Sequence, residues 1–304
     1  MEIGVWVWGI GNREEFSGSL MESLDFLAEH GVSRLYVKAA DGIYEWTQFA
    51  KVINPLKDRG FEVWSWSYCY GEDPQREAEL ALKAIDLGSA GHVLDAEAEF
   101  RDLQDNAVAA EYLCSTVKAF TDKPLWYTSF AYPRFHPRFP WQAFNQHCDG
   151  AMPQVFSAYG GVWSPTETGS IAATDYSNAG LLKPIVPVWE MFTPESQSLS
   201  AGEYVAAWND ALEFGRLDIF RWGIVGAMGY ETLRMLKGGA APHPCHDLVN
   251  LLGYLQGDLA DDFEKAMLGI RQEQNRRGSM RKGQVGKYLA NLETLVNTLK
   301  TEGK

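Results

Sequence analysis

The stretch Gly91-His92-Val93-Leu94-Asp95-Ala96-Glu97-Ala98-Glu99-Phe100 passes from an apolar run into acidic residues at every second position. Alternate residues of a β-strand point to one face. The run therefore predicts a buried strand with Asp95, Glu97 and Glu99 on the same face at its far end. Like charges held this close cost stability unless they share protons or hydrogen bonds, which separates their pKa values. A solvated acidic strand end that leads into a loop is the alternative interpretation.

A strand-then-helix rhythm surrounds this stretch. Strand-like runs occur at Glu2–Trp8, Ser33–Lys38, Phe61–Tyr68, Gly91–Glu97, Pro124–Thr128, Gly150–Phe156, Pro184–Trp189 and Trp222–Met228. Each is followed by a segment of helical periodicity, and eight such units in roughly 240 residues predict an α/β fold, a (β/α)8 TIM barrel. A doubly wound sheet is disfavoured because Gly9-Ile10-Gly11-Asn12 lacks the third glycine of a phosphate-binding loop.

The sequence changes character near Gly238-Gly239-Ala240-Ala241-Pro242, beyond which the pattern is helical. We therefore expect two parts, a barrel over residues 1–240 and a helical C-terminal extension over residues 241–304. The last predicted helix carries apolar residues at a/d spacing over barely two heptads, at Leu289, Leu292, Val296 and Leu299. This helix either packs on the barrel or supports self-association.

Composition limits the possible partners. The net charge of -13 argues against nucleic acid and anionic membrane surfaces. No apolar run approaches the roughly 18 residues of a membrane span. The chain enters a strand at Met1-Glu2-Ile3 without the regions of a signal peptide, and its 4 cysteines form no Cys-x-x-Cys pair. These features predict a protein that is cytoplasmic or released without a signal peptide.

Chemical groups gather at the predicted strand ends. Barrels of this class hold their reacting groups at the C-terminal ends of the strands, and aromatic rings in a cleft stack on sugars. The chain has 11 Trp, and several of them fall at these ends. The candidate substrate-binding residues are Trp8, Asp41, Trp66, Tyr68, Glu99, Tyr127, Gln154 and Trp189. Carboxylates, aromatic rings and an amide together are typical of a carbohydrate cleft.

Carboxylates supply the candidate catalytic residues. Two neighbouring acids with unequal pKa values suit the cleavage of a glycosidic bond. We expect Glu97 to be the general acid, and Asp95 to stay ionised and orient the substrate or stabilise positive charge at the anomeric carbon. Glu190 is the reserve nucleophile or base. Tyr127 and Gln154 are candidates for hydrogen bonds to that centre or to an acetamido group.

Metal chemistry has weak support. His243-Pro244-Cys245-His246 holds metal-capable side chains, but no second cluster lies at ligand spacing, so we expect no metal and no cofactor. His92 falls on the strand face opposite Asp95 and is interpreted as a hydrogen-bonded core histidine. No Gly-x-Ser-x-Gly elbow occurs, so serine hydrolysis has no support.

Three short segments resemble the family 25 glycoside hydrolases, which are lysozyme-like muramidases. They are Leu35-Tyr36-Val37-Lys38-Ala39-Ala40-Asp41-Gly42, Leu94-Asp95-Ala96-Glu97 and Trp126-Tyr127-Thr128-Ser129. The resemblance spans roughly the predicted barrel and implies that Glu97 is the catalytic acid and Asp95 its companion carboxylate. The Asp-x-Glu pair is also similar to part of the acidic run of family 18 chitinases. The first strand departs from family 25, with Trp6-Val7-Trp8 where that family has an Asp.

Two functions remain as hypotheses. The first is a glycosidase that cleaves a polysaccharide, with N-acetylated cell-wall glycan as the expected class. The second is a non-catalytic carbohydrate-binding barrel in a larger assembly such as a phage particle. The departures in the first and last strands and the helical tail favour the second. A metal-dependent hydrolase is disfavoured by the shortage of histidine at the strand ends.

Overall fold

The computed structural model describes residues 2–9, 20–156, 168–190 and 209–222 of the chain. Within these ranges, parallel strands form a closed ring, since β1 pairs with both β2 and β9. The ring consists of β1 (Glu2–Val7), β2 (Val32–Asp41), β4 (Glu62–Cys69), β5 (His92–Ala96), β6 (Leu125–Phe130), β7 (Gly150–Gln154), β8 (Val188–Glu190) and β9 (Arg216–Trp222). A short antiparallel strand, β3 (Tyr44–Glu45), pairs with the end of β2.

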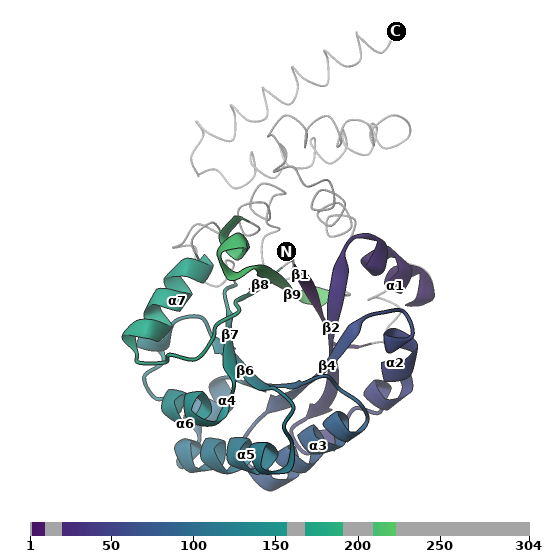
Figure 1. Cartoon of the computed structure of the whole chain (residues 1–304). Helices are drawn as coiled ribbons and strands as arrows, with labels where there is room; N and C mark the ends of the chain where they lie inside the picture. The colour runs from purple at the N-terminus through teal and green to yellow at the C-terminus, as the bar shows by residue number, and fades with distance from the viewer. Residues whose placement is uncertain (1, 10–19, 157–167, 191–208, 223–304) are drawn as a thin grey trace, which may run out of the picture. The chain divides into compact units, whose positions relative to one another are not determined.

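Helices surround the ring on its outer side (Figure 1). They are α1 (Leu20–Glu29), α2 (Gln48–Lys57), α3 (Pro74–Asp86), α4 (Ala98–Asp102), α5 (Asn106–Phe120), α6 (Trp141–His147) and α7 (Thr168–Asn178), with 3-10 turns η1 (Pro133–Phe135) and η3 (Leu212–Phe214). The expected (β/α)8 TIM barrel is confirmed. Among the helices described, none has the length and apolar character that a membrane span requires.

The chain divides into two compact units, Met1–His243 and Pro244–Lys304. All described residues belong to the first unit. The expected helical extension over residues 241–304 lies outside the described residues, so its helices and its self-association stay predictions.

The last strand differs from the prediction. We expected it at Trp222–Met228, but β9 occupies Arg216–Trp222, and the residues after Trp222 lie outside the described part. The charged Arg216 and Asp218 make this segment look unlike a buried strand. Inside the barrel their side chains form an ion pair of 2.7 Å, which offsets part of the cost of burying both charges.

Aromatic side chains fill the inside of the barrel. Trp6, Tyr36, Trp64 and Trp66 belong to one buried cluster there. Glycine makes room for them, since a Cβ atom on Gly91 would lie 2.5 Å from the ring of Trp64. The barrel is therefore packed like a core along its length, and a ligand must bind at one of its ends.

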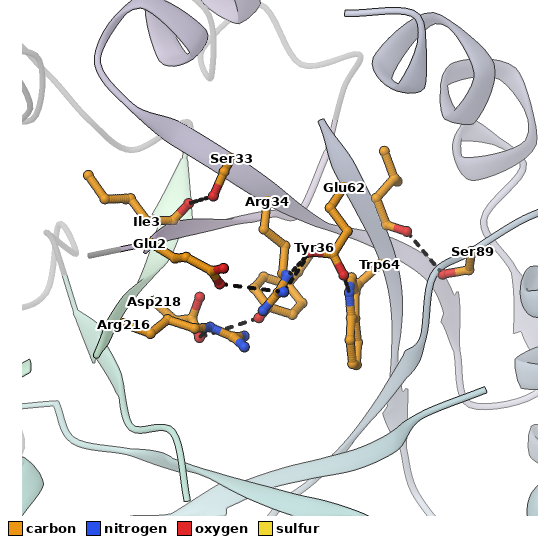
Figure 2. A network of polar contacts seen from close by, with 11 residues as sticks. Glu2, Ile3, Ser33, Arg34, Tyr36, Glu62, Trp64, Ser89, Arg216 and Asp218 are labelled. Carbon is orange, nitrogen blue, oxygen red and sulfur yellow. Dashed lines mark hydrogen bonds and ion pairs between the residues drawn. The ribbon is translucent and has the colours of Figure 1, made fainter. Parts of the chain in front are cut away.

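A polar network occupies the N-terminal end of the barrel (Figure 2). Arg34 pairs with Glu62 at 2.5 Å, and the hydroxyl of Tyr36 donates to Asp218 at 3.3 Å. Burial raises the pKa of Asp218 to about 6, although Arg216 beside it favours the charged form. This end of a barrel ordinarily serves stability, so the candidate site belongs to the opposite end.

Candidate active site

The acidic run ends a strand and begins a helix. β5 closes at Ala96, so Glu97 occupies the N-cap position of α4 and Glu99 lies in its first turn. The expected alternation of three carboxylates along one strand is therefore wrong. Alanine and glutamate are good helix formers, and an acidic first turn suits the helix dipole, so the helix starts earlier than the alternation suggests. Asp95 and Glu97 nevertheless meet at the C-terminal end of the barrel.

One amide joins the two acids. The Nε2 atom of Gln154, at the end of β7, donates to Oδ1 of Asp95 at 3.0 Å and to Oε1 of Glu97 at 2.9 Å. The two carboxyl groups are also hydrogen-bonded to each other. Such a bond requires a proton on one of them, because an ionised carboxylate can only accept. A hydrogen bond between the two carboxyl groups therefore suits a pair that holds a single proton.

The surroundings decide where this proton rests. Burial, and then the charge of Glu97 and the hydrogen bond to it, raise the pKa of Asp95 well above its ordinary range. Burial also raises the pKa of Glu97, while hydrogen bonds from Gln154 and Asp95 lower it. These directions favour the proton on Asp95 rather than on Glu97, opposite to the expectation that Asp95 stays ionised. The reason is depth, since Asp95 lies buried in the strand and Glu97 is closer to solvent.

Two further predicted residues, Tyr68 and Glu99, lie beside the pair. The hydroxyl of Tyr68 donates to Oε2 of Glu99 at 2.5 Å. Burial and this bond raise the pKa of Tyr68. Tyr68 is the register partner of Asp95 on the neighbouring strand, which places the phenol and Glu99 next to the acid pair.

Sequence reasoning does not identify Lys38 as a site residue, yet it lies inside the mouth of the barrel. Its Nζ atom lies 2.6 Å from Oδ2 of Asp41, another predicted residue. The register between β2 and β4 shifts after Lys38, and this β-bulge turns Asp41 to the same side although the two are three residues apart. The ammonium also lies over indole rings, 4.0 Å from the centroid of Trp8, 4.5 Å from that of Trp46 and 4.9 Å from that of Trp66. In the sequence, Lys38 is the charged residue within an otherwise apolar run of β2, and this is the signal that could have identified it as a site residue.

Three predicted aromatic residues do not face the mouth. Tyr127 is fully buried and stacks on Phe144 of α6 with ring centroids 5.2 Å apart, and Trp189 packs against Phe214 of η3. Both point into the helical layer, because neighbouring strand residues alternate between the two faces. This orientation contradicts the prediction that Tyr127 and Trp189 bind substrate. Trp66 faces the interior but is fully buried beneath Lys38, so it forms the floor of the mouth.

The remaining predictions fall on core or undescribed positions. His92 is buried, and its ring nitrogens lie 2.7 Å and 2.9 Å from the hydroxyls of Ser65 and Ser67, so the core-histidine interpretation is confirmed. The backbone of Glu190 belongs to β8, but its side chain lies outside the described residues. The whole segment His243–His246 also lies outside the described residues. Within the described ranges, no group of three His, Cys, Asp or Glu side chains could hold a metal ion.

Comparison with solved structures finds the same barrel in proteins of very different sequence. A chitinase from Chromobacterium violaceum is 11% identical, with a TM-score of 0.54 over 77% of this chain and 98% of the chitinase. The PgaB (BpsB) glycoside hydrolase domain from Bordetella bronchiseptica is 10% identical, with a TM-score of 0.55 over 77% and 98% of the two chains. A xylanase-A-amylase inhibitor protein is 13% identical, with a TM-score of 0.54 over 78% and 98%. The chain has the fold of these barrels.

Sequence comparisons, by contrast, find no similar protein. No protein-family model matches the chain, and no curated protein does. The resemblance to glycoside hydrolases therefore holds at the level of the barrel, and the finer assignment to family 25 has no support from these comparisons.

Proposed function

We propose that the protein is a glycoside hydrolase that cleaves an N-acetylated polysaccharide at the C-terminal mouth of its barrel. The observation that carries the proposal is the Asp95–Glu97 pair, whose two carboxyl groups both accept from the side-chain amide of Gln154. A buried pair of this kind supplies an acid and a charge within one site, as glycosidic cleavage requires. The glycoside hydrolases among the similar barrels agree with this proposal.

The chemistry follows from the position of the two acids. Glu97 lies nearer to solvent, so it meets the glycosidic oxygen and donates the proton that it takes from Asp95. The Asp95 carboxylate that results then faces the positive charge developing at the anomeric carbon. Both acids are thus used in turn, with Gln154 holding them at a fixed separation.

The other described carboxylates of the mouth favour an N-acetylated substrate. Asp41 is bound by Lys38 and by the hydroxyl of Tyr70, and Glu99 is bound by Tyr68. A carboxylate engaged in this way is a poor nucleophile. In substrate-assisted glycosidases the acetamido group of the sugar acts as the nucleophile, so an N-acetyl glycan suits a mouth whose other described acids are engaged in this way.

The test is Glu97→Gln, assayed on chito-oligosaccharides and on peptidoglycan by the release of reducing ends. Loss of a general acid lowers kcat by about 10²- to 10⁴-fold. The matched control is Glu111→Gln, which removes an exposed carboxylate on α5 and leaves turnover unchanged. Unchanged turnover in a folded Glu97→Gln variant would remove Glu97 as the acid.

A second candidate function is binding without cleavage. Asp41 and Glu99 at the mouth are bound by Lys38, Tyr70 and Tyr68, and carboxylates engaged in this way are poor nucleophiles, which favours binding without cleavage. One of the similar barrels is described as an inhibitor protein. Calorimetric titration with chito-oligosaccharides and peptidoglycan fragments separates the two functions. Binding by the wild type with no reducing ends formed supports the carbohydrate-binding barrel.

A further inference from the structure

Lys38 is a cation enclosed inside the mouth of the barrel. Its side chain is 0% exposed, and the carboxylate that it contacts, Asp41, is 28% exposed. A substrate approaching from solvent therefore meets Asp41 and the aromatic rings before it could meet the ammonium. Lys38 acts on its protein neighbours rather than on a ligand.

The surroundings of Lys38 hold the charge in one place. Faces of the indoles of Trp8, Trp46 and Trp66 lie within about 5 Å of Nζ, and such contacts attract a cation. Gln48 links the backbone of Trp8 to that of Lys38, because its Nε2 donates to the carbonyl oxygens of both residues, at 2.6 Å and 3.1 Å. A fixed cation in a site sheltered from water acts more strongly on nearby charges than an exposed one.

Lys38 lies near the acid pair, because its Nζ atom is 5.9 Å from the centroid of the Tyr68 ring and Tyr68 is the register partner of Asp95. The titratable groups that interact with Asp95 are Lys38 of β2, Tyr68 and Cys69 of β4, and Glu97 at the N-cap of α4. Glu99 acts on Glu97, and Asp41 is paired with Lys38. Lys38 is the cation of this set. It lowers the pKa of Asp95, whereas burial and Glu97 raise it.

We propose that Lys38 is a positioning residue whose caged ammonium maintains one negative charge on the Asp95–Glu97 pair. Without it, burial and mutual repulsion favour full protonation of the pair, and the charged state forms only at higher pH. The catalytic meaning of this inference rests on the proposed function, because the singly charged pair is the form that holds both an acid and a carboxylate.

The test is a titration of the full-length chain, labelled with ¹³C at Asp and Glu carboxyl carbons and followed by NMR. Lys38→Met keeps the length of the side chain and removes its charge. The expected result is that the carboxyl titration of the pair moves to higher pH by about 1 pH unit or more. The matched control is Lys83→Met, which removes an ammonium 2.7 Å from Glu45 at an exposed ion pair and leaves the pair's titration in place.

A second variant, Asp41→Asn, tests the inference independently if the Lys38→Met protein does not fold. Asp41→Asn keeps an acceptor for Tyr70 and removes the negative charge beside Lys38. It is expected to move the titration of the pair to lower pH, opposite to Lys38→Met, and a purely structural role predicts no such opposition. A folded Lys38→Met variant with an unmoved titration, or an Asp41→Asn variant without the downward movement, overturns the inference.

The titration needs no substrate, so its result does not depend on whether the proposed function is correct. If the wild type cleaves no glycan while both variants move the titration as expected, the glycosidase proposal fails and the inference about Lys38 stands. If the wild type is active, both limbs of its pH profile move upward in Lys38→Met together with the titration. An active variant whose profile does not move overturns the inference.

Discussion

Gln154 and Asp95 are joined across the mouth of the barrel by a hydrogen bond of 3.0 Å from Nε2 to Oδ1. The same nitrogen donates to Glu97 at 2.9 Å, so one amide bridges two carboxyl groups that come from the end of a different strand. This bridge brings β5 and β7 together although the strand β6 lies between them. It fixes the acid pair more firmly than either strand end could alone.

Replacing this bridge by a third acid should disable the site. Gln154→Glu has the same shape but no donor, and it adds a negative charge beside two carboxyl groups. We expect glycan cleavage to fall by about 10²-fold and the free energy of unfolding to fall by about 1–3 kcal/mol. Kinetics with chito-oligosaccharides and urea denaturation measure the two effects. Gln142→Glu, which alters an exposed amide that donates to a backbone oxygen on the surface, serves as the control and should change neither.

Tyr127 and Tyr68 should respond differently to removal of their hydroxyl groups. The buried hydroxyl of Tyr127 has no hydrogen-bond partner among the described residues, so Tyr127→Phe should leave glycan binding unchanged. Its free energy of unfolding should stay level or rise by up to about 1 kcal/mol. Tyr68→Phe loses the bond to Glu99 at the mouth and should weaken binding. Calorimetric titration and urea denaturation of both variants test this contrast, and equal losses of binding would contradict it.

The sequence predicts the barrel because the strand-then-helix rhythm is a local property. It also predicts that Asp95, Glu97 and Gln154 converge, since the C-terminal strand ends of a barrel share one rim. It does not predict which face a strand residue takes, because a shift of one residue reverses every side chain. For this reason the prediction places Tyr127 and Trp189 at the mouth, whereas both pack in the apolar core.

Long-range pairing explains the other differences. The ion pair of Lys38 with Asp41 depends on a bulge, and a bulge is set by the neighbouring strand rather than by the residues that it displaces. Likewise Arg216 and Asp218 look like surface residues until the closed sheet places both inside the barrel. Local hydrophobicity therefore does not predict charges that become buried only when neighbouring strands pair and the sheet closes.

Gly4 is expected to tolerate no side chain. A Cβ atom there would lie 1.9 Å from Oδ1 of Asp218 and 3.0 Å from the ring of Tyr36, so Gly4→Ala overpacks the N-terminal end of the barrel. The expected loss of unfolding free energy is about 1–3 kcal/mol. A double-mutant cycle with Asp218→Ala provides the control, because the alanine at position 4 should cost less when the carboxylate is absent. Equal costs in both backgrounds would show that the clash is not with Asp218.

Asp218 should make the stability of the protein depend on pH with a negative slope. Burial raises its pKa to about 6 in the folded chain, against the usual 3.8. Between these two values the folded state binds more protons than the unfolded state, so the free energy of unfolding falls as pH rises through this window. The fall amounts to about 3 kcal/mol and levels off above pH 6 to 7. Asp218→Asn has no proton to lose there and should lack this component.

The comparison uses the difference between wild type and Asp218→Asn in urea denaturation from pH 4 to pH 8. The difference is needed because burial also raises the pKa of Glu77, to about 7, and that group titrates in an overlapping range in both proteins. Subtraction removes the contribution of Glu77 and leaves that of Asp218. A difference that stays constant across this range, or that grows in favour of the wild type as pH rises, would mean that Arg216 and Arg34 outweigh the burial of the Asp218 carboxylate.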